Sequence, residues 1–283
     1  MNIEPTQHTT QPAEATDGPA VKSIESPAPY PGSVSTPAIP TPSTTCTTQV
    51  DENDQAALVR ARDTERANAL QRYSPEVRAE ATAMLADPAL MDRISKDIVA
   101  CGVIGEDLNG RMLYLIGTSR LLESPLSAIV QGSSSSGKSR VIEKVAQLFP
   151  KEDVLMATDI SPQALYYGPP SLLVHRFVVA GERRRGDGQV RTEPTRALRE
   201  MLSSGKLEKL VTTPNAKGPM QSVHLTRYGP IAFVESTTDF QVFNEDANRM
   251  IRLSSDETPE QTKRVLRFSA ERAAGATSDV SHI

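Results

Sequence analysis

The chain has 283 residues, of which 38% are hydrophobic and 23% are charged, and its formal net charge is -4. These values are ordinary for a protein in solution with one sizeable domain. The longest apolar runs are far too short to cross a bilayer, and the N-terminus has neither the basic start nor the apolar core of a signal peptide. We therefore expect a cytoplasmic protein without a membrane partner. Cys46 and Cys101 lie in segments of different character, and the four histidines are scattered, which predicts neither a disulfide framework nor a zinc site.

The N-terminal part of the chain divides by composition into two segments. Residues 1–50 are roughly half Pro, Ser and Thr and contain almost no bulky apolar side chains. This composition predicts a disordered tail, because burial cannot offset the entropy lost on ordering. Residues 51–123 have helical periodicity instead. Asp87 and the following proline predict the start of one helix that Gly102 ends, and a second helix is expected over 106–122.

Residues 124–255 alternate short apolar strands with helical stretches, which is typical of a mostly parallel sheet covered by helices. The sequence therefore predicts an α/β core. Strands are expected at 126–131, 153–157, 173–180 and 230–235. Between the last two strands we expect a helix over 192–203 and a β-hairpin with arms at 206–213 and 220–227. In the last segment, 256–283, we expect one helix over 258–274 and a frayed tail over 275–283.

Residues 132–139 read GSSSSGKS and match the phosphate-binding pattern G-x-x-x-x-G-K-[ST] between a predicted strand and a predicted helix. Glycines permit a tight loop whose N–H groups converge on phosphates, Lys138 reaches the β- and γ-phosphates, and the Ser139 hydroxyl ligates Mg²⁺. The start of the following helix attracts the same anions. The alternative is a flexible Ser/Gly-rich turn. We predict ATP and Mg²⁺ as cofactors, and the expected nucleotide-binding residues are Gly132, Ser133, Ser134, Ser135, Ser136, Gly137, Lys138, Ser139 and Arg140.

A nucleotide-hydrolysing site also needs an acid at the end of a neighbouring strand, to complete the Mg²⁺ shell or to polarise the attacking water. The apolar run FVVAGE ends in Glu182, which we predict as the general base and as a group on the metal side of the site. Gly181 stands where the usual acidic pair has its aspartate. A second metal-side carboxylate is therefore expected to be absent or supplied elsewhere. The alternative is a solvated glutamate at a strand end.

Two further residues are candidates for sensing or stabilising the reacting phosphate. Thr238 follows the strand at 230–235, and its hydroxyl is predicted to contact the γ-phosphate or the attacking water, with Thr237 as the second choice. The alternative is an ordinary Ser/Thr-rich turn. Arg249, on a short helix expected over 244–250, is predicted to reach the site of a neighbouring subunit and to stabilise developing charge. The alternative is a solvated or locally paired arginine.

Basic side chains occur in two places near these candidates. Three arginines, 183–185, follow Glu182 directly, and Lys206, Lys209 and Lys217 lie on the expected hairpin. Both groups can meet a nucleic-acid backbone. No aromatic side chains are interleaved for base stacking, so a solvated charged surface is the alternative. DNA remains a candidate partner.

Taken together, GSSSSGKS, FVVAGE, the hairpin before the fourth strand, VESTTD and NEDANRM resemble the AAA+ ATPases, in the branch with a hairpin before sensor 1. That branch includes minichromosome-maintenance-type helicases. The run over 87–267 is similar, more closely, to the ATPase region of bacterial mobile-element proteins that often also carry a CHC-type zinc-finger primase module. The resemblance implies a three-layer P-loop sandwich with a helical lid, ATP hydrolysis, a homo-oligomeric ring and action on DNA in replication or mobilisation.

The chain departs from this pattern in two ways. It has no zinc-ligand cluster or primase catalytic domain, so priming activity does not transfer. Only the helix expected over 258–274 follows the core, so the lid with its second sensor arginine is expected to be short or truncated. The leading hypothesis is an ATP-hydrolysing motor that acts on DNA. The alternatives are a P-loop kinase of a small acceptor, and a nucleotide-binding regulator or remnant with little turnover, which Gly181 and the short lid favour.

Overall fold

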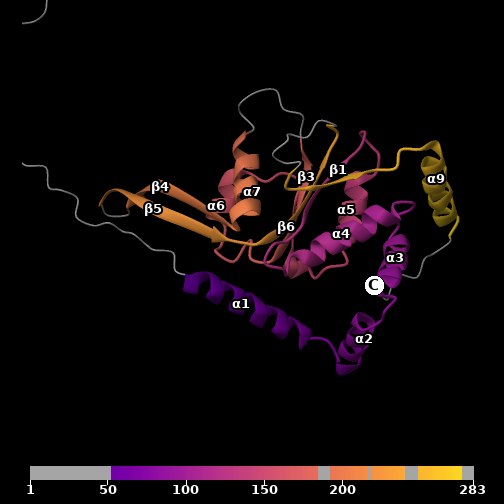
Figure 1. The fold of residues 1–283 in the computed structure, drawn as a ribbon, viewed down its shortest axis with the longest axis horizontal. Coiled ribbons are helices and arrows are strands. Elements are labelled where there is room, and N and C mark those ends of the chain that lie inside the picture. The colour runs from indigo at the N-terminus through magenta and orange to yellow at the C-terminus, as the bar shows by residue number, and fades with distance from the viewer. Residues whose placement is uncertain (1–51, 184–191, 216–217, 240–247, 276–283) are drawn as a thin grey trace, which may run out of the picture. The chain divides into compact units, whose positions relative to one another are not determined.

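A computed structural model describes residues 52–183, 192–215, 218–239 and 248–275 (Figure 1). All described residues belong to one compact unit, Thr47–Ile283. The tail predicted for residues 1–50 lies outside the described residues, as does most of the one predicted for 275–283.

Five parallel strands form the central sheet in the order β2-β3-β6-β1-β7. Their bounds are β1 Ser127–Gln131, β2 Val154–Ala157, β3 Arg176–Arg183, β6 Ile231–Thr237 and β7 Ile251–Ser254. The four strands expected from the sequence are confirmed as β1, β2, β3 and β6, with β3 shifted toward its C-terminus. β7 was not predicted, because it has only four residues and only Leu253 among them is buried.

Alternate residues of the sheet enter two separate hydrophobic cores, one on each face. In β6, Ala232 and Val234 belong to the first core, whereas Ile231 and Phe233 belong to the second. All residues of β1 and β6 are buried, as expected for central strands of a parallel sheet. The α/β fold is thereby confirmed, with the sheet between two layers of helices (Figure 1). The first face is covered by α3 (Leu90–Ala100), α4 (Asp107–Ser119) and α5 (Lys138–Ala146), and the second by α6 (Pro162–Tyr167) and α7 (Thr192–Ser204).

Local signals explain two helix ends that matter for the site. The helix predicted over 258–274 is confirmed as α9 (Pro259–Ala273). The Thr258 hydroxyl caps its start by accepting a hydrogen bond from the Gln261 N–H at 3.2 Å. Gly102 follows α3 with a φ of +93°, a left-handed conformation that glycine adopts without strain. Both the cap and this glycine lie beside the cavity described below.

The expected hairpin is confirmed, with longer arms, as β4 (Lys206–Asn215) and β5 (Gly218–Tyr228). It forms its own two-stranded antiparallel sheet and precedes β6 in the chain. Arg227 Nε donates to a backbone carbonyl of the turn after α6 at 2.8 Å. The Lys209 ammonium lies 5.1 Å from the centroid of the Tyr166 ring. These contacts hold the hairpin against α6.

The first described helices are α1 (Glu52–Leu70) and α2 (Pro75–Leu85). Helix α1 is joined to the rest of the unit by an ion cluster that the sequence did not reveal. Asp153 Oδ1 accepts hydrogen bonds from Arg62 at 2.8 Å and from Arg66 at 3.2 Å, and Asp153 Oδ2 accepts one from Arg120 at 2.8 Å. Arg62 and Asp153 are each 2% exposed. Burial alone raises the pKa of Asp153, but the hydrogen bonds and charges of Arg120 and Arg66 outweigh it and hold that pKa below its usual value.

Replacing Asp153 by alanine is expected to lower the free energy of unfolding by roughly 3–5 kcal/mol, because buried guanidinium groups lose their counter-charge. Urea unfolding at neutral pH measures this loss. Since the folded-state pKa of Asp153 is lowered, its contribution is present above the unfolded-state pKa and disappears as the pH falls through the folded-state value. Asp63→Ala removes an exposed partner of Arg66 and is the control. Equal unfolding free energies for Asp153→Ala and Asp63→Ala would contradict the prediction.

Candidate functional site

The predicted strand, loop and helix around GSSSSGKS are present. β1 ends at Gln131, the chain turns through residues 132–137, and α5 begins at Lys138. Gly137, directly before the helix, has a φ of +91°, and Ser135 has a φ of 66°. A Cβ atom added at Gly137 would meet no atom within 4 Å, so the backbone conformation, and not space, calls for glycine here. We name this segment the 132–139 loop.

Lys138 is folded back on the 132–139 loop. Its ammonium donates to the Gly132 carbonyl at 3.0 Å and to the Ser133 carbonyl at 2.6 Å, and the residue is 5% exposed. A buried ammonium needs such acceptors. In contrast, Ser139 and Arg140 in the first turn of α5 are exposed, and the Arg140 guanidinium reaches the Gly102 carbonyl at 3.4 Å. The two residues predicted to bind nucleotide and metal thus both lie at the start of α5, Lys138 buried and Ser139 exposed.

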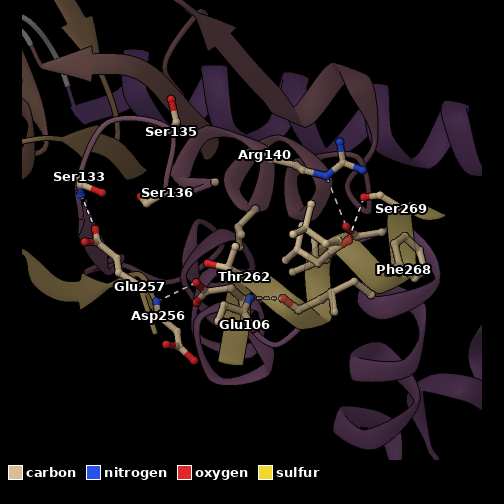
Figure 2. Close-up of a pocket in the computed structure, with 18 of the residues that line it drawn as sticks. Glu106, Ser133, Ser135, Ser136, Arg140, Asp256, Glu257, Thr262, Phe268 and Ser269 are labelled. Atoms are coloured by element: carbon tan, nitrogen blue, oxygen red, sulfur yellow. Dashed lines mark hydrogen bonds between the residues drawn. The ribbon is translucent and has the colours of Figure 1, made fainter. Parts of the chain in front are cut away.

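A cavity of about 510 Å³ opens beside the loop, and we name it the loop cavity (Figure 2). Three segments line it: residues 102–104 and 106, residues 133–137 of the loop with Arg140 and Val141 of α5, and residues between 256 and 269 in the β7–α9 turn and α9. Lys138 and Ser139 lie next to these residues in the chain but are not part of the lining. Its volume is within the range of sites for small organic ligands. The loop end is polar. The α9 side contributes apolar side chains, among them Val265 and Leu266, which are 42% and 64% exposed.

Two walls of the loop cavity are joined by hydrogen bonds between segments far apart in the sequence. Gln261 of α9 donates to the Ile104 carbonyl, and the Asp256 N–H donates to a carboxylate oxygen of Glu106 at 2.9 Å (Figure 2). Glu106 is buried, and burial raises its pKa although the hydrogen bonds from Asp256 and Asn109 act in the opposite direction. These residues were missed by sequence reasoning, because no local pattern relates the turn after α3 to the segment after β7.

Glu182 lies near the end of β3, opposite Ser236 of β6, and is exposed. The β3–β6 pairing is irregular between Val179 and Glu182. Next to it, a Cβ atom at Gly181 would lie 2.2 Å from the Thr158 carbonyl oxygen. A side chain therefore fits at position 181 only if the backbone around Thr158 moves. Close backbone packing thus explains why glycine stands where an aspartate was expected.

The strand order places the end of β6 between the ends of β3 and β1. The Thr237 carbonyl accepts a hydrogen bond from the Gly132 N–H at 3.3 Å, so the tip of β6 touches the start of the 132–139 loop. The Thr237 hydroxyl accepts the Asp239 N–H at 3.0 Å within its own turn, and Thr237 is buried. Thr238 is half-buried. The hydroxyl of Thr237, the second choice, thus caps the turn, and the role of Thr238 stays a prediction.

Arg249 does not belong to the site of its own chain. It precedes β7, which runs parallel to β1, so it lies at the edge of the sheet where the strands begin, whereas the 132–139 loop lies where they end. Its Nε donates to the Ser203 hydroxyl at 2.8 Å. Residues 248–250 form a turn, and the rest of the helix expected over 244–250 lies outside the described residues. Any contact between Arg249 and a bound phosphate must therefore involve a second copy of the chain.

The basic candidates are divided between described and undescribed positions. Lys206 forms an exposed ion pair with Glu208 at 3.2 Å, and Lys209 lies over an aromatic ring as described above. Arg184, Arg185 and Lys217 lie outside the described residues.

In the part of the chain that the structure describes, no helix is long and apolar enough to span a membrane. Comparison with known protein families gives no match, and comparison with curated proteins gives none either.

Proposed function

We propose that the chain is an ATP-binding and ATP-hydrolysing motor of the AAA+ type that works on DNA in the cytoplasm. The observation that carries the proposal is the 132–139 loop at the end of β1, with Lys138 and Ser139 opening α5 beside a cavity of ligand size. Such a loop places backbone N–H groups and a helix start around one anion. A strand–loop–helix unit with this sequence is suited to a phosphate chain and to little else.

One end of the loop cavity is polar and the other is apolar, which matches the phosphates and the base of a nucleotide. Phosphates fit at the loop, where Lys138 can exchange two backbone carbonyls for phosphate oxygens. A flat, largely apolar base fits toward α9, beside Val265, Leu266 and Phe268. The arrangement supports binding of a nucleoside triphosphate such as ATP.

The chain's own residues also suit Mg²⁺. The exposed Ser139 hydroxyl in the first turn of α5 provides one hard oxygen ligand, and phosphate oxygens provide others. Bound Mg²⁺ would neutralise charge that develops on the transferred phosphoryl group. Glu182, at the end of the strand two places from β1, is the carboxylate proposed to take the proton of the attacking water. Thr238, directly after the strand between them, is proposed to sense the γ-phosphate.

The motor part of the proposal rests on Arg249 and on the hairpin. Arg249 lies at the wrong edge of the sheet for its own loop, which suits a role in a neighbouring subunit of a homo-oligomeric ring. The β4–β5 hairpin stands outside the central sheet, and Lys206 and Lys209 lie on it. We propose that it contacts the DNA backbone.

A second function has one observation in its favour. The packing of Gly181 against Thr158 leaves no room for a second acid beside Glu182. A protein with one carboxylate at this position fits a nucleotide-binding regulator with little turnover. A kinase of a small acceptor is the third candidate, and the loop cavity by itself is compatible with it.

Phosphate release from MgATP distinguishes these functions when it is measured over a range of protein concentrations, with and without single-stranded and duplex DNA. For a motor, specific activity should rise with protein concentration and with DNA, because subunits complete each other's sites. Arg249→Ala should bind MgATP like the parent but lose this rise, whereas Arg252→Ala, on the exposed side of β7, should not.

Binding of ATP without phosphate release would favour the regulator. Transfer of phosphate to a small acceptor would favour the kinase. Activity that is independent of concentration, of Arg249 and of DNA would contradict the motor.

A further inference from the structure

Glu257 contacts the 132–139 loop from the far end of the chain. The Ser133 N–H donates to a Glu257 carboxylate oxygen, across 124 residues of sequence (Figure 2). The approach is so close that a Cβ atom at Gly132 would lie 2.9 Å from that oxygen and 2.7 Å from the Ser136 hydroxyl. Glycine at position 132 therefore makes room for the Glu257 carboxylate as well as for the loop itself. A hydrogen bond from an amide to a carboxylate is charge-assisted and stronger than a neutral one.

Glu257 and Lys138 hold opposite sides of one peptide group. The Gly132 carbonyl and the Ser133 N–H belong to the same trans peptide, so they point in opposite directions. Lys138 donates to the carbonyl at 3.0 Å, and Glu257 accepts from the N–H. The carboxylate therefore lies on the side of the peptide away from the ammonium. Glu257 also belongs to the lining of the loop cavity.

The segment that carries Glu257 is itself fixed to α9 and to the 102–106 segment. The Asp256 N–H donates to Glu106, and one Asp256 carboxylate oxygen accepts the Thr258 N–H at 2.9 Å. The other oxygen accepts a hydrogen bond from Arg264 of α9 at 3.0 Å. These contacts hold the pKa of Asp256 below its usual value, mainly through Thr258. Glu257 thus connects the loop to a segment that moves with α9.

We infer that Glu257 is a positioning residue that braces the 132–139 loop and couples it to α9. The Lys138 ammonium has three donors, and the Gly132 and Ser133 carbonyls accept two of them, so one remains for a phosphate oxygen. Lys138 therefore holds the carbonyl side of the 132–133 peptide, and the Glu257 carboxylate holds its N–H side. The same hydrogen bond ties the start of α9 to the loop, so ligand at the loop and the position of α9 influence each other. The nucleotide part of this inference rests on the proposed function, but the brace itself does not.

The test compares Glu257→Ala and Glu257→Gln with the parent, because glutamine keeps an oxygen acceptor and loses only the charge. Glu260→Ala, which removes an exposed carboxylate three positions further along the same segment, is the matched control. Two quantities are measured: hydrogen exchange of the backbone amides over 132–137 and α9 in nucleotide-free protein, and the dissociation constant of MgATP by calorimetry.

For Glu257→Ala we expect faster exchange in the loop and in the first turn of α9. The dissociation constant should rise about five- to tenfold, less than for the loss of a direct phosphate contact, because Glu257 acts on the loop and not on the ligand. Glu257→Gln should recover most of both effects, and Glu260→Ala should show neither. If Glu257→Ala does not fold, Glu257→Asp, whose side chain is one methylene shorter, takes its place.

If the loop amides of Glu257→Ala exchange hydrogen at the same rate as those of the parent, the proposed brace is overturned, whatever the dissociation constant of MgATP. Tighter ATP binding by Glu257→Ala also overturns it, because the carboxylate would then be a competitor of phosphate. If the parent binds no ATP, the proposed function fails, and the exchange measurements still decide on the brace.

Discussion

Lys138→Ala is expected to weaken MgATP binding by about 10- to 100-fold and to abolish detectable phosphate release. The ammonium is the one side-chain cation that the 132–139 loop places beside the Gly132 and Ser133 carbonyls, among the residues that the structure describes. Losing a charge-assisted contact to phosphate costs roughly 1.5–3 kcal/mol of binding free energy, which corresponds to that range of affinity. Calorimetric titration with MgATP and a phosphate-release assay measure the two effects.

The control for this variant must separate ligand contacts from folding, because Lys138 is buried and satisfies two carbonyls. Thermal unfolding of the nucleotide-free variant reports the structural part. Lys144→Ala, on the same helix, removes a half-buried lysine whose ammonium donates to Gln147 at 3.0 Å and to none of the described loop residues, and should behave like the parent. Parent-like ATP affinity and turnover in a folded Lys138→Ala protein would remove the phosphate-loop assignment.

Glu182→Gln is expected to reduce ATP hydrolysis by roughly 100-fold or more while leaving MgATP binding intact. Glutamine has nearly the size of glutamate and keeps its hydrogen bonding, but it cannot take a proton from water. Single-turnover hydrolysis measures the chemical step, and calorimetry measures binding. Glu208→Gln, which alters an exposed carboxylate on the hairpin, is the control.

A Glu182→Gln protein that hydrolyses ATP at the parent's rate would show that the base lies elsewhere. If the parent itself binds ATP but releases no detectable phosphate, the regulator becomes the better description. The structural reason for the low turnover is then the packing of Gly181 against the Thr158 carbonyl, because this packing keeps a second acid out of this position.

Sequence patterns were sufficient for features that depend on neighbouring residues. The glycines and the lysine of the 132–139 loop, the apolar runs of β1 and β6, and the Thr258 cap of α9 are local signals, and each corresponds to an observed element. The fold class followed from the alternation of such elements. Helix α9 was expected as a partial lid, and the structure places its apolar residues along the loop cavity.

The features that escaped prediction depend on contacts between distant segments. β7 is too short for periodicity to reveal it, so the turn that carries Asp256 and Glu257 was not placed beside the loop. The ion cluster around Asp153 joins α1 to residues about ninety positions later, and no spacing rule connects them. Likewise, glycine is needed at position 181 because the Thr158 carbonyl lies close to it, and only the folded chain brings the two together.

The short outer strands of the sheet bear on how copies of the chain can associate. β2 and β7, at the two ends of the strand order, have four residues each, and β7 exposes Arg252. Short border strands offer few free backbone groups to an incoming strand, which is one way natural sheets avoid growing by strand addition, and an exposed charge such as Arg252 on β7 acts in the same direction. A ring of these subunits would therefore close through helices and loops, with each sheet ending inside its own subunit. In the proposed motor, subunits would then associate and separate without breaking a continuous ladder of backbone hydrogen bonds.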